Sequence, residues 1–187
     1  MPVLDGREQE RQGILATANL MVVAARTAPK SGGRDDILTA VATGPEVEAL
    51  AEEVERIAVG RNDPAWSKPA KIIRNATAIV LIGVRGTKSY VTNCGACGYD
   101  SCADFTKAVK KAGQDFDGPN CIFKTMDLGI ALCSAAKIAS ILNVDNRLYY
   151  RIGVAARRLG FMPEASVIIG MPLSATGKNP NFDREKG

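Results

Sequence analysis

Four cysteines are the residues of this chain best suited to chemistry. Cys94, Cys97 and Cys102 lie close together and Cys121 follows later, which gives the spacing C-x2-C-x4-C-x18-C. Thiolates are the soft ligands that iron–sulfur clusters and zinc require. Three thiols in one tight loop and a fourth beyond a helix-length segment can converge on one metal centre. The spacing favours a 4Fe–4S cluster bound by all four cysteines, and with it a protein that handles electrons.

The residues around the cysteines fit such a cluster. Gly95 and Gly98 permit the positive φ angles with which a backbone wraps closely around a cofactor. Ser101 is a candidate N-cap for a helix that continues to near Gly113. The positive N-terminus of that helix would face a negatively charged cluster. Four lysines add positive charge nearby and fit an ordinary solvated helix face: Lys107, Lys110, Lys111 and Lys124.

Zinc, redox-active thiols and disulfides are the alternatives to a cluster. Zinc sites prefer two short paired spacings separated by a longer linker, whereas here the first three cysteines are grouped and the fourth stands apart. The total of five cysteines is odd, and the sequence shows no signal peptide, which argues against a disulfide framework. Cys133 lies in an apolar helical stretch, where a lone cysteine is expected to be a small buried hydrophobe outside the site.

Composition excludes several classes of function. The chain of 187 residues is expected to form a single domain over 1–187, with the four-cysteine module inserted at 90–124. A net charge of +4, without an arginine-rich run interleaved with aromatics, gives no support for nucleic-acid binding. The apolar runs are too short to span a membrane, so a cytoplasmic protein is expected. Histidine is absent, which removes Ser-His-Asp and Cys-His catalysis.

Helical and strand-like segments alternate along the chain. Helical periodicity predicts helices over 8–26, 46–59, 126–142 and 147–159, and continuous apolar runs predict strands over 36–42, 78–84 and 166–170. The strand at 78–84 should be buried on both faces because it contains no polar residue. A polar connector over 61–69 and an exposed tail from Ser174 complete the chain. The alternation predicts a layered α/β or α+β domain.

Two resemblances follow from these segments. The stretch Cys94-Gly95-Ala96-Cys97-Gly98-Tyr99, with Cys102 and Cys121, resembles the small four-cysteine iron–sulfur modules of electron-transfer complexes and corrinoid iron–sulfur proteins. The remainder resembles the FMN-dependent nitroreductases, in the turn that ends Ala28-Pro29-Lys30-Ser31 and in the segments 127–159 and 167–172. Over about residues 7–172, the complete arrangement resembles a family of bacterial and archaeal ferredoxin-domain proteins.

The resemblance implies an α+β, nitroreductase-like three-layer fold with a central mixed sheet, an inserted iron–sulfur loop and an FMN pocket at a homodimer interface. Arg7 and Arg11 would then bind the FMN phosphate, and Lys30, Ser31 and Arg34 would contact the flavin or its phosphate. Solvated arginines on a helix end and a purely structural turn are the alternatives.

Three functions therefore stay open. The protein is a flavin-linked oxidoreductase with a cluster, a cluster-binding electron carrier or redox sensor without flavin, or a zinc-stabilised structural protein. The sequence identifies neither the redox partner nor a small-molecule substrate.

Overall fold

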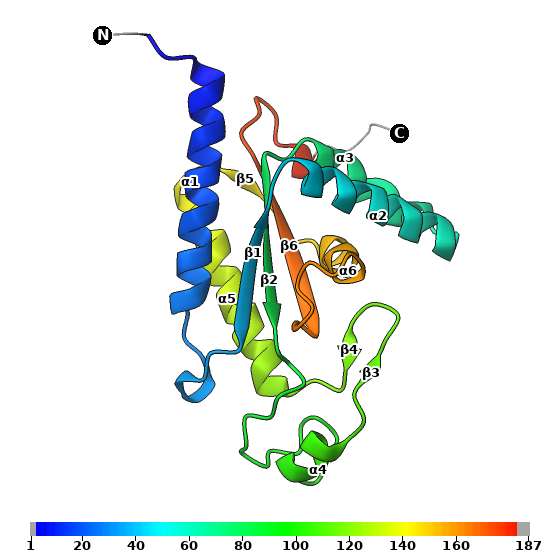
Figure 1. Cartoon of the computed structure of the whole chain (residues 1–187). Coiled ribbons are helices and arrows are strands. Elements are labelled where there is room, and N and C mark those ends of the chain that lie inside the picture. Colours follow the sequence, from blue (N-terminus) through cyan, green and yellow to red (C-terminus); the bar gives the residue numbers. More distant parts are fainter. Residues whose placement is uncertain (1–2, 183–187) are drawn as a thin grey trace.

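A four-stranded antiparallel sheet forms the centre of the computed structural model, which describes residues 3–182 (Figure 1). The strands lie in the order β1-β2-β6-β5. Their bounds are Ile37–Ala42 for β1, Ala78–Val84 for β2, Asp145–Asn146 for β5 and Val167–Ser174 for β6. Strand β2 lies inside the sheet and every one of its residues is buried, as its apolar sequence predicts.

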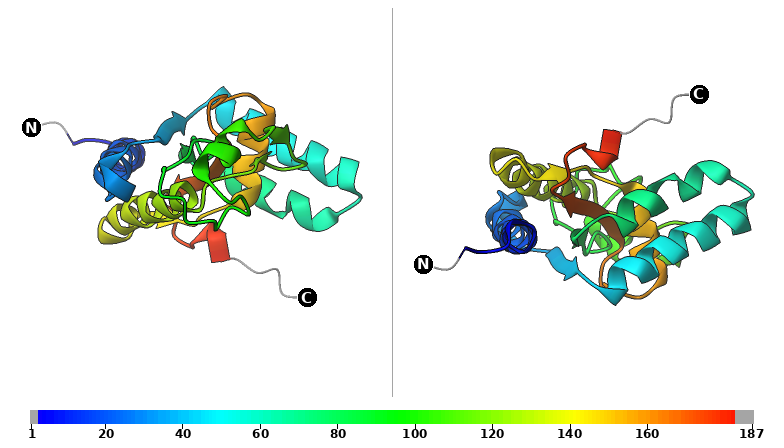
Figure 2. Two further views of the ribbon diagram at one scale, coloured as in Figure 1. Left: turned by 90° about the horizontal axis from the view of Figure 1, so that it is seen from below. Right: turned by 90° about the horizontal axis from the view of Figure 1, so that it is seen from above.

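Helices cover both faces of this sheet and create three layers (Figure 2). Helices α1 (Gly6–Thr27) and α5 (Ile122–Ile141) pack on one face, where Val80 and Ile82 of β2 contribute to the core. Helices α2 (Pro45–Arg61), α3 (Lys68–Arg74) and α6 (Tyr150–Arg158) pack on the other, against Ile79 and Leu81. Successive β2 side chains enter the two cores in turn, because successive side chains of a strand point to opposite faces of the sheet. The predicted three-layer α+β fold is confirmed.

The sheet is antiparallel at every strand pair among residues 3–182, so the prediction of a mixed sheet was wrong. Strand β1 pairs with β2 from Ile37↔Val84 to Ala42↔Ile79. Between these strands the chain leaves along α2 and returns along α3, so it re-enters the sheet at the end that it left (Figure 1). A parallel strand would instead require a crossover that returns the chain to the opposite end of the sheet.

Several element boundaries differ from the sequence predictions. Helix α4 covers only Cys102–Lys107, because Ala108 has extended backbone angles, and the short strands β3 (Lys111–Ala112) and β4 (Asp117–Gly118) form a hairpin after it. Helix α5 begins at Ile122, four residues before the predicted start. The polar connector contains the short helix η2 (Pro64–Ser67) and the start of α3. Two further short helices are η1 (Ser31–Gly33) and η3 (Pro180–Phe182), and the buried Asn181 lies in the segment predicted to be exposed.

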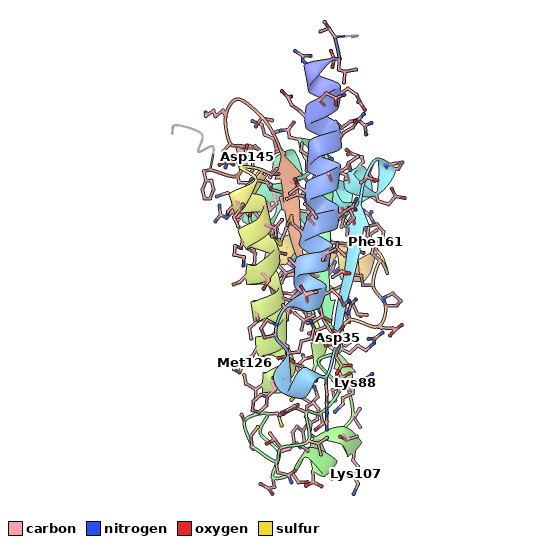
Figure 3. All side chains as sticks on the ribbon, turned by 90° about the vertical axis from the view of Figure 1, so that its left-hand side faces the viewer. Asp35, Lys88, Lys107, Met126, Asp145 and Phe161 are labelled. Carbon is pink, nitrogen blue, oxygen red and sulfur yellow. The ribbon has the colours of Figure 1, made fainter. Side chains whose placement is uncertain are left out.

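The segment between β2 and α5 projects beyond one end of the sheet (Figures 1 and 3). In Figure 3, Lys107 marks α4 at the tip of this segment, and Met126 marks the adjacent end of α5. The β3–β4 hairpin is fastened to the body of the fold by ion pairs of Asp115 with Arg61 and of Asp117 with Arg157. The projecting segment is therefore supported from the α2–α6 side as well as by its two chain ends.

Candidate functional site

Cys94, Cys97, Cys102 and Cys121 line a single cavity in the projecting segment. The first three cysteines come from the loop after β2 and the start of α4, and the fourth immediately precedes α5. Four residues of the loop have positive φ angles: Val91, Asn93, Gly95 and Gly98. The two glycines were predicted to supply this conformation. The chain adopts it at Asn93 as well, a residue type that tolerates it, and at Val91, where the β-branched side chain makes it costly.

Cys121 is buried and is held against the end of β2. Its backbone N–H donates to the carbonyl oxygen of Gly86 at 2.8 Å. The N–H of Gly86 donates to the Oγ atom of Ser166 at 2.9 Å, and this hydroxyl donates to Oδ1 of Asn120 at 2.6 Å. A Cβ atom on Gly86 would overlap the Asn120 side chain, so glycine is needed for the close approach. The fourth cysteine is thus positioned by residues that flank β2 and β6 at one end of the sheet.

Cys102 is positioned by hydrogen bonds within the loop. Ser101 is the N-cap of α4, as predicted, because its Oγ accepts from the N–H of Asp104 at 3.1 Å. The N–H of Cys102 donates to Oδ1 of Asn93 at 2.8 Å, and the N–H of Asn93 donates to the Cys102 Sγ at 3.2 Å. The Ser89 side chain and, after it, the Asn93 N–H lower the pKa of the Cys102 thiol. Both donors favour the thiolate, which is the form that binds metal.

The four sulfur atoms share the walls of one cavity without converging on one point. Among residues 3–182, no three or more Cys, Asp or Glu side chains are grouped closely enough to hold a single metal ion. Thiolates that bind a cubane each bind a different iron atom, so they surround a volume and not a point. The chemistry of the donor set, four thiols around one cavity, fits a 4Fe–4S cluster, and ligation itself stays a prediction.

Cys133 does not line this cavity. It is exposed on α5, so the prediction that it is buried was wrong. Helix α5 has apolar residues on nearly all sides, and its sequence therefore does not reveal which face packs on the sheet. The buried side of the helix is formed instead by residues such as Leu128, Leu132 and Ala135.

The candidate flavin residues lie at opposite ends of α1. Arg7 and Arg11 are exposed in its first turns, where Arg11 forms an ion pair with Glu8 at 2.7 Å. Lys30, Ser31 and Arg34 follow its C-terminus. At 1.5 Å per residue, the helix separates the two groups by roughly 30 Å. One copy of the chain therefore does not bring all five residues to one ligand.

Lys30 and Ser31 make contacts inside the protein. The Lys30 ammonium donates to the carbonyl oxygens of Ala28 at 2.8 Å and Ala25 at 3.3 Å, and its side chain is only 5% exposed. It therefore caps the C-terminus of α1, where a cation is favourable. The N–H and Oγ of Ser31 both donate to Oδ1 of Asp127 at 2.8 Å. Arg34 donates to the carbonyl oxygen of Tyr90 at 3.0 Å.

A buried charged group next to the cysteines was missed by the sequence analysis. Lys124 is 0% exposed, and its ammonium lies 2.9 Å from Oδ2 of Asp36, so the prediction of a solvated lysine was wrong. The available signal was its position on α5, because residues 124, 128, 131 and 135 follow one helical stripe that packs on the sheet. Helix α5 was predicted to begin after Lys124, which hid that signal.

No helix among residues 3–182 combines the length and the apolar character needed to cross a bilayer.

Two family models match adjacent parts of the chain. The model described as "Putative Fe-S cluster" matches residues 91–118, which contain Cys94, Cys97 and Cys102. The model described as "Uncharacterized protein containing a ferredoxin domain (DUF2148)" matches residues 117–184, which contain Cys121. A relative from Archaeoglobus fulgidus is 45% identical over 182 residues, which is 97% of this chain and 97% of the relative.

Solved structures of nitroreductases share the fold. A nitroreductase with bound FMN from Desulfitobacterium hafniense DCB-2 is 16% identical, with 98% of this chain and 85% of that chain covered and a TM-score of 0.55. An FMN-dependent nitroreductase from Clostridium difficile R20291 is 13% identical, with coverages of 87% and 76% and a TM-score of 0.54. At these identities the likeness concerns the fold alone, and it confirms the nitroreductase-like architecture.

Proposed function

Because this chain belongs to the family of proteins that contain a ferredoxin domain, we propose that Cys94, Cys97, Cys102 and Cys121 bind a 4Fe–4S cluster. The observation that carries the proposal is that four thiols, from the loop after β2, from α4 and from the residue before α5, line one cavity. A cluster bound there would supply one-electron transfer. We therefore assign the protein a redox role, as an electron-transfer protein or a flavin-linked oxidoreductase.

The surrounding residues prepare the cavity for this role. Ser89 and the Asn93 N–H favour the Cys102 thiolate, and an N–H aimed at a ligating sulfur stabilises the additional negative charge of a reduced cluster. Cys121 is buried while Cys94 is exposed, so one side of the cavity is closed by protein and the other faces solvent. Electrons would enter and leave through the exposed side, where a redox partner can approach.

A second copy of the chain would complete a flavin site. In a two-fold dimer with antiparallel α1 helices, Arg7 and Arg11 of one copy would lie near the 30–34 turn of the other. Exposed apolar side chains on α1 and α5 support such a dimer, among them Leu20 and Val23 on α1 and Ile130 on α5. Arg7 and Arg11 would bind the FMN phosphate, and the turn would contact the flavin, which supplies hydride chemistry.

An electron carrier or redox sensor without flavin is the second candidate. It is favoured by the internal contacts of Lys30 and Ser31, because both side chains already have partners within the chain. The zinc alternative would require all four sulfur atoms to draw in to about 2.3 Å from one ion. We also propose a cytoplasmic location, because thiols stay reduced there.

Anaerobic purification followed by analysis of iron, sulfide, zinc and flavin tests the proposal. About four irons per chain, as the cubane requires, are expected. A colourless protein with one zinc per chain would refute the cluster, and FMN released on heating would select the oxidoreductase over the carrier. Light scattering should give twice the chain mass of 19.8 kDa if the dimer forms.

Two matched cysteine variants test the ligand assignment. Cys97→Ser removes a thiol that lines the cavity and should abolish cluster binding. Cys133→Ser removes a thiol outside the cavity and should leave the iron content unchanged. Equal loss of iron from both variants would show that the assignment is wrong.

A further inference from the structure

A buried ion-pair network lies beside the cysteine cavity. The Lys124 ammonium contacts Oδ2 of Asp36 at 2.9 Å, the carbonyl oxygen of Arg34 at 3.2 Å and Oδ2 of Asp127 at 3.9 Å. Oδ2 of Asp127 is buried and has no hydrogen-bond partner. In Figure 3, the labels of Asp35 and Met126 mark the two segments that supply these groups, at the end of the sheet from which the cysteine segment projects. Lys88 marks the start of that segment.

Tyr90 connects this network to the wall of the cavity. Tyr90 lines the cavity together with the cysteines. The Lys124 Nζ lies 6.0 Å and the Arg34 Cζ 5.6 Å from the centroid of its ring. Lys124 is also three residues from Cys121, less than one turn of α5. A cation with almost no solvent exposure therefore lies close to an aromatic residue of the cavity wall.

Packing alone does not explain a charge at this position. Removing an ammonium and a carboxylate from water costs several kcal/mol per ion, and apolar residues of similar volume often replace such a pair without loss of stability. The same burial means that solvent and salt screen the Lys124 charge little, although the carboxylates of Asp36 and Asp127 oppose part of its field. Its field is therefore the property that an apolar substitute would not reproduce.

We propose that the positive charge of Lys124 raises the reduction potential of the cluster. This inference rests on the proposed function. Reduction adds one negative charge to the cluster, and a fixed positive charge nearby stabilises the reduced form. Lys88 forms an ion pair with the same carboxylate, to Oδ1 of Asp36 at 3.4 Å, but its side chain is 60% exposed. Solvent and salt screen Lys88, so it has little effect on the potential.

Redox titration of the reconstituted full-length protein, followed by electron paramagnetic resonance, tests this role. Lys124→Met should reduce the ratio of reduced to oxidised cluster at least tenfold at a fixed applied potential, which is a shift of about 59 mV for one electron. Lys88→Met should change the ratio less than twofold, and Lys124→Arg should restore the wild-type value. Equal potentials for Lys124→Met and wild type would overturn the proposal.

Lys124→Met leaves Asp36 buried without its closest cation, and this variant can therefore fail to fold. A second pair of variants covers that case. Asp36→Asn and the double variant that combines Asp36→Asn with Lys124→Met differ only in the ammonium of Lys124. The reduction potential of the cluster should be lower in the double variant. Equal potentials in this pair would also overturn the proposal. If wild-type protein reconstitutes no iron, the proposed function and this inference both fail. If it holds a cluster whose potential ignores Lys124, only the inference fails.

Discussion

Replacing Ser166 with alanine removes a buried hydroxyl that holds the Cys121 segment against the sheet. In the structure this hydroxyl accepts from the N–H of Gly86 at 2.9 Å and donates to Oδ1 of Asn120 at 2.6 Å. The carbonyl oxygen of Gly86 in turn accepts from the N–H of Cys121 at 2.8 Å. The substitution therefore acts two hydrogen bonds away from a candidate cluster ligand without touching its thiol.

The magnitude follows from the groups left without partners. Ser166→Ala leaves the Gly86 N–H and Oδ1 of Asn120 unsatisfied, and each buried unsatisfied group costs about 1–3 kcal/mol. Because the half-buried Asn120 side chain can turn toward water, we expect a total loss of roughly 2–4 kcal/mol in the free energy of unfolding. For a domain of this size, the melting temperature should fall by roughly 5–15 °C.

Urea unfolding of the metal-free protein measures this loss without any contribution from a cluster. Ser140→Ala, on the exposed surface of α5, is the matched control and should change the free energy of unfolding by less than about 0.5 kcal/mol. A value for Ser166→Ala within the same limit would refute the anchoring role of the hydroxyl. In that case Cys121 would be held by its helix alone.

Further substitutions test the site and its supports. Ser89→Ala should raise the pKa of Cys102, because the Ser89 side chain favours its thiolate. Alkylation of Cys102 in metal-free protein, followed by mass spectrometry, should therefore begin at higher pH. An unchanged pH midpoint of alkylation would contradict this. Gly32→Ala should destabilise the protein by about 1–3 kcal/mol, since φ is +58° and a Cβ atom would lie 2.8 Å from the Tyr90 ring. Gly13→Ala, in open space on α1, should instead stabilise the protein by about 0.5–1 kcal/mol. Urea unfolding measures both changes, and free-energy changes of the same sign for the two variants would show the backbone argument to be wrong.

Much of the fold was predictable because its signals are local. Helical periodicity identified α1, α2 and α6, and a continuous apolar run identified β2 as a strand buried on both faces. The glycines of the cysteine loop and the Ser101 cap were recognisable because turn conformations and N-caps restrict the residue type. These features depend on a few neighbouring residues.

The direction of the strands was not predictable in the same way. The return of the chain along α3 makes β2 antiparallel to β1, and α3 begins where the sequence showed only a polar connector. A helix of seven residues has too few turns to show clear periodicity. Its existence depends on packing against α2, which no local pattern describes.

The amino-acid order alone was sufficient to specify the chemical character of the candidate site: four thiols, glycines that allow a tight loop, and no histidine. It did not specify which charged side chains would lie beside the cavity that the cysteines line. Lys124 is buried beside Asp36 because α5 starts early enough to turn that side chain toward the sheet, and the two residues are far apart in the chain. Burial and long-range pairing depend on the whole set of packed elements, so they became visible only when the helices were seen against the sheet.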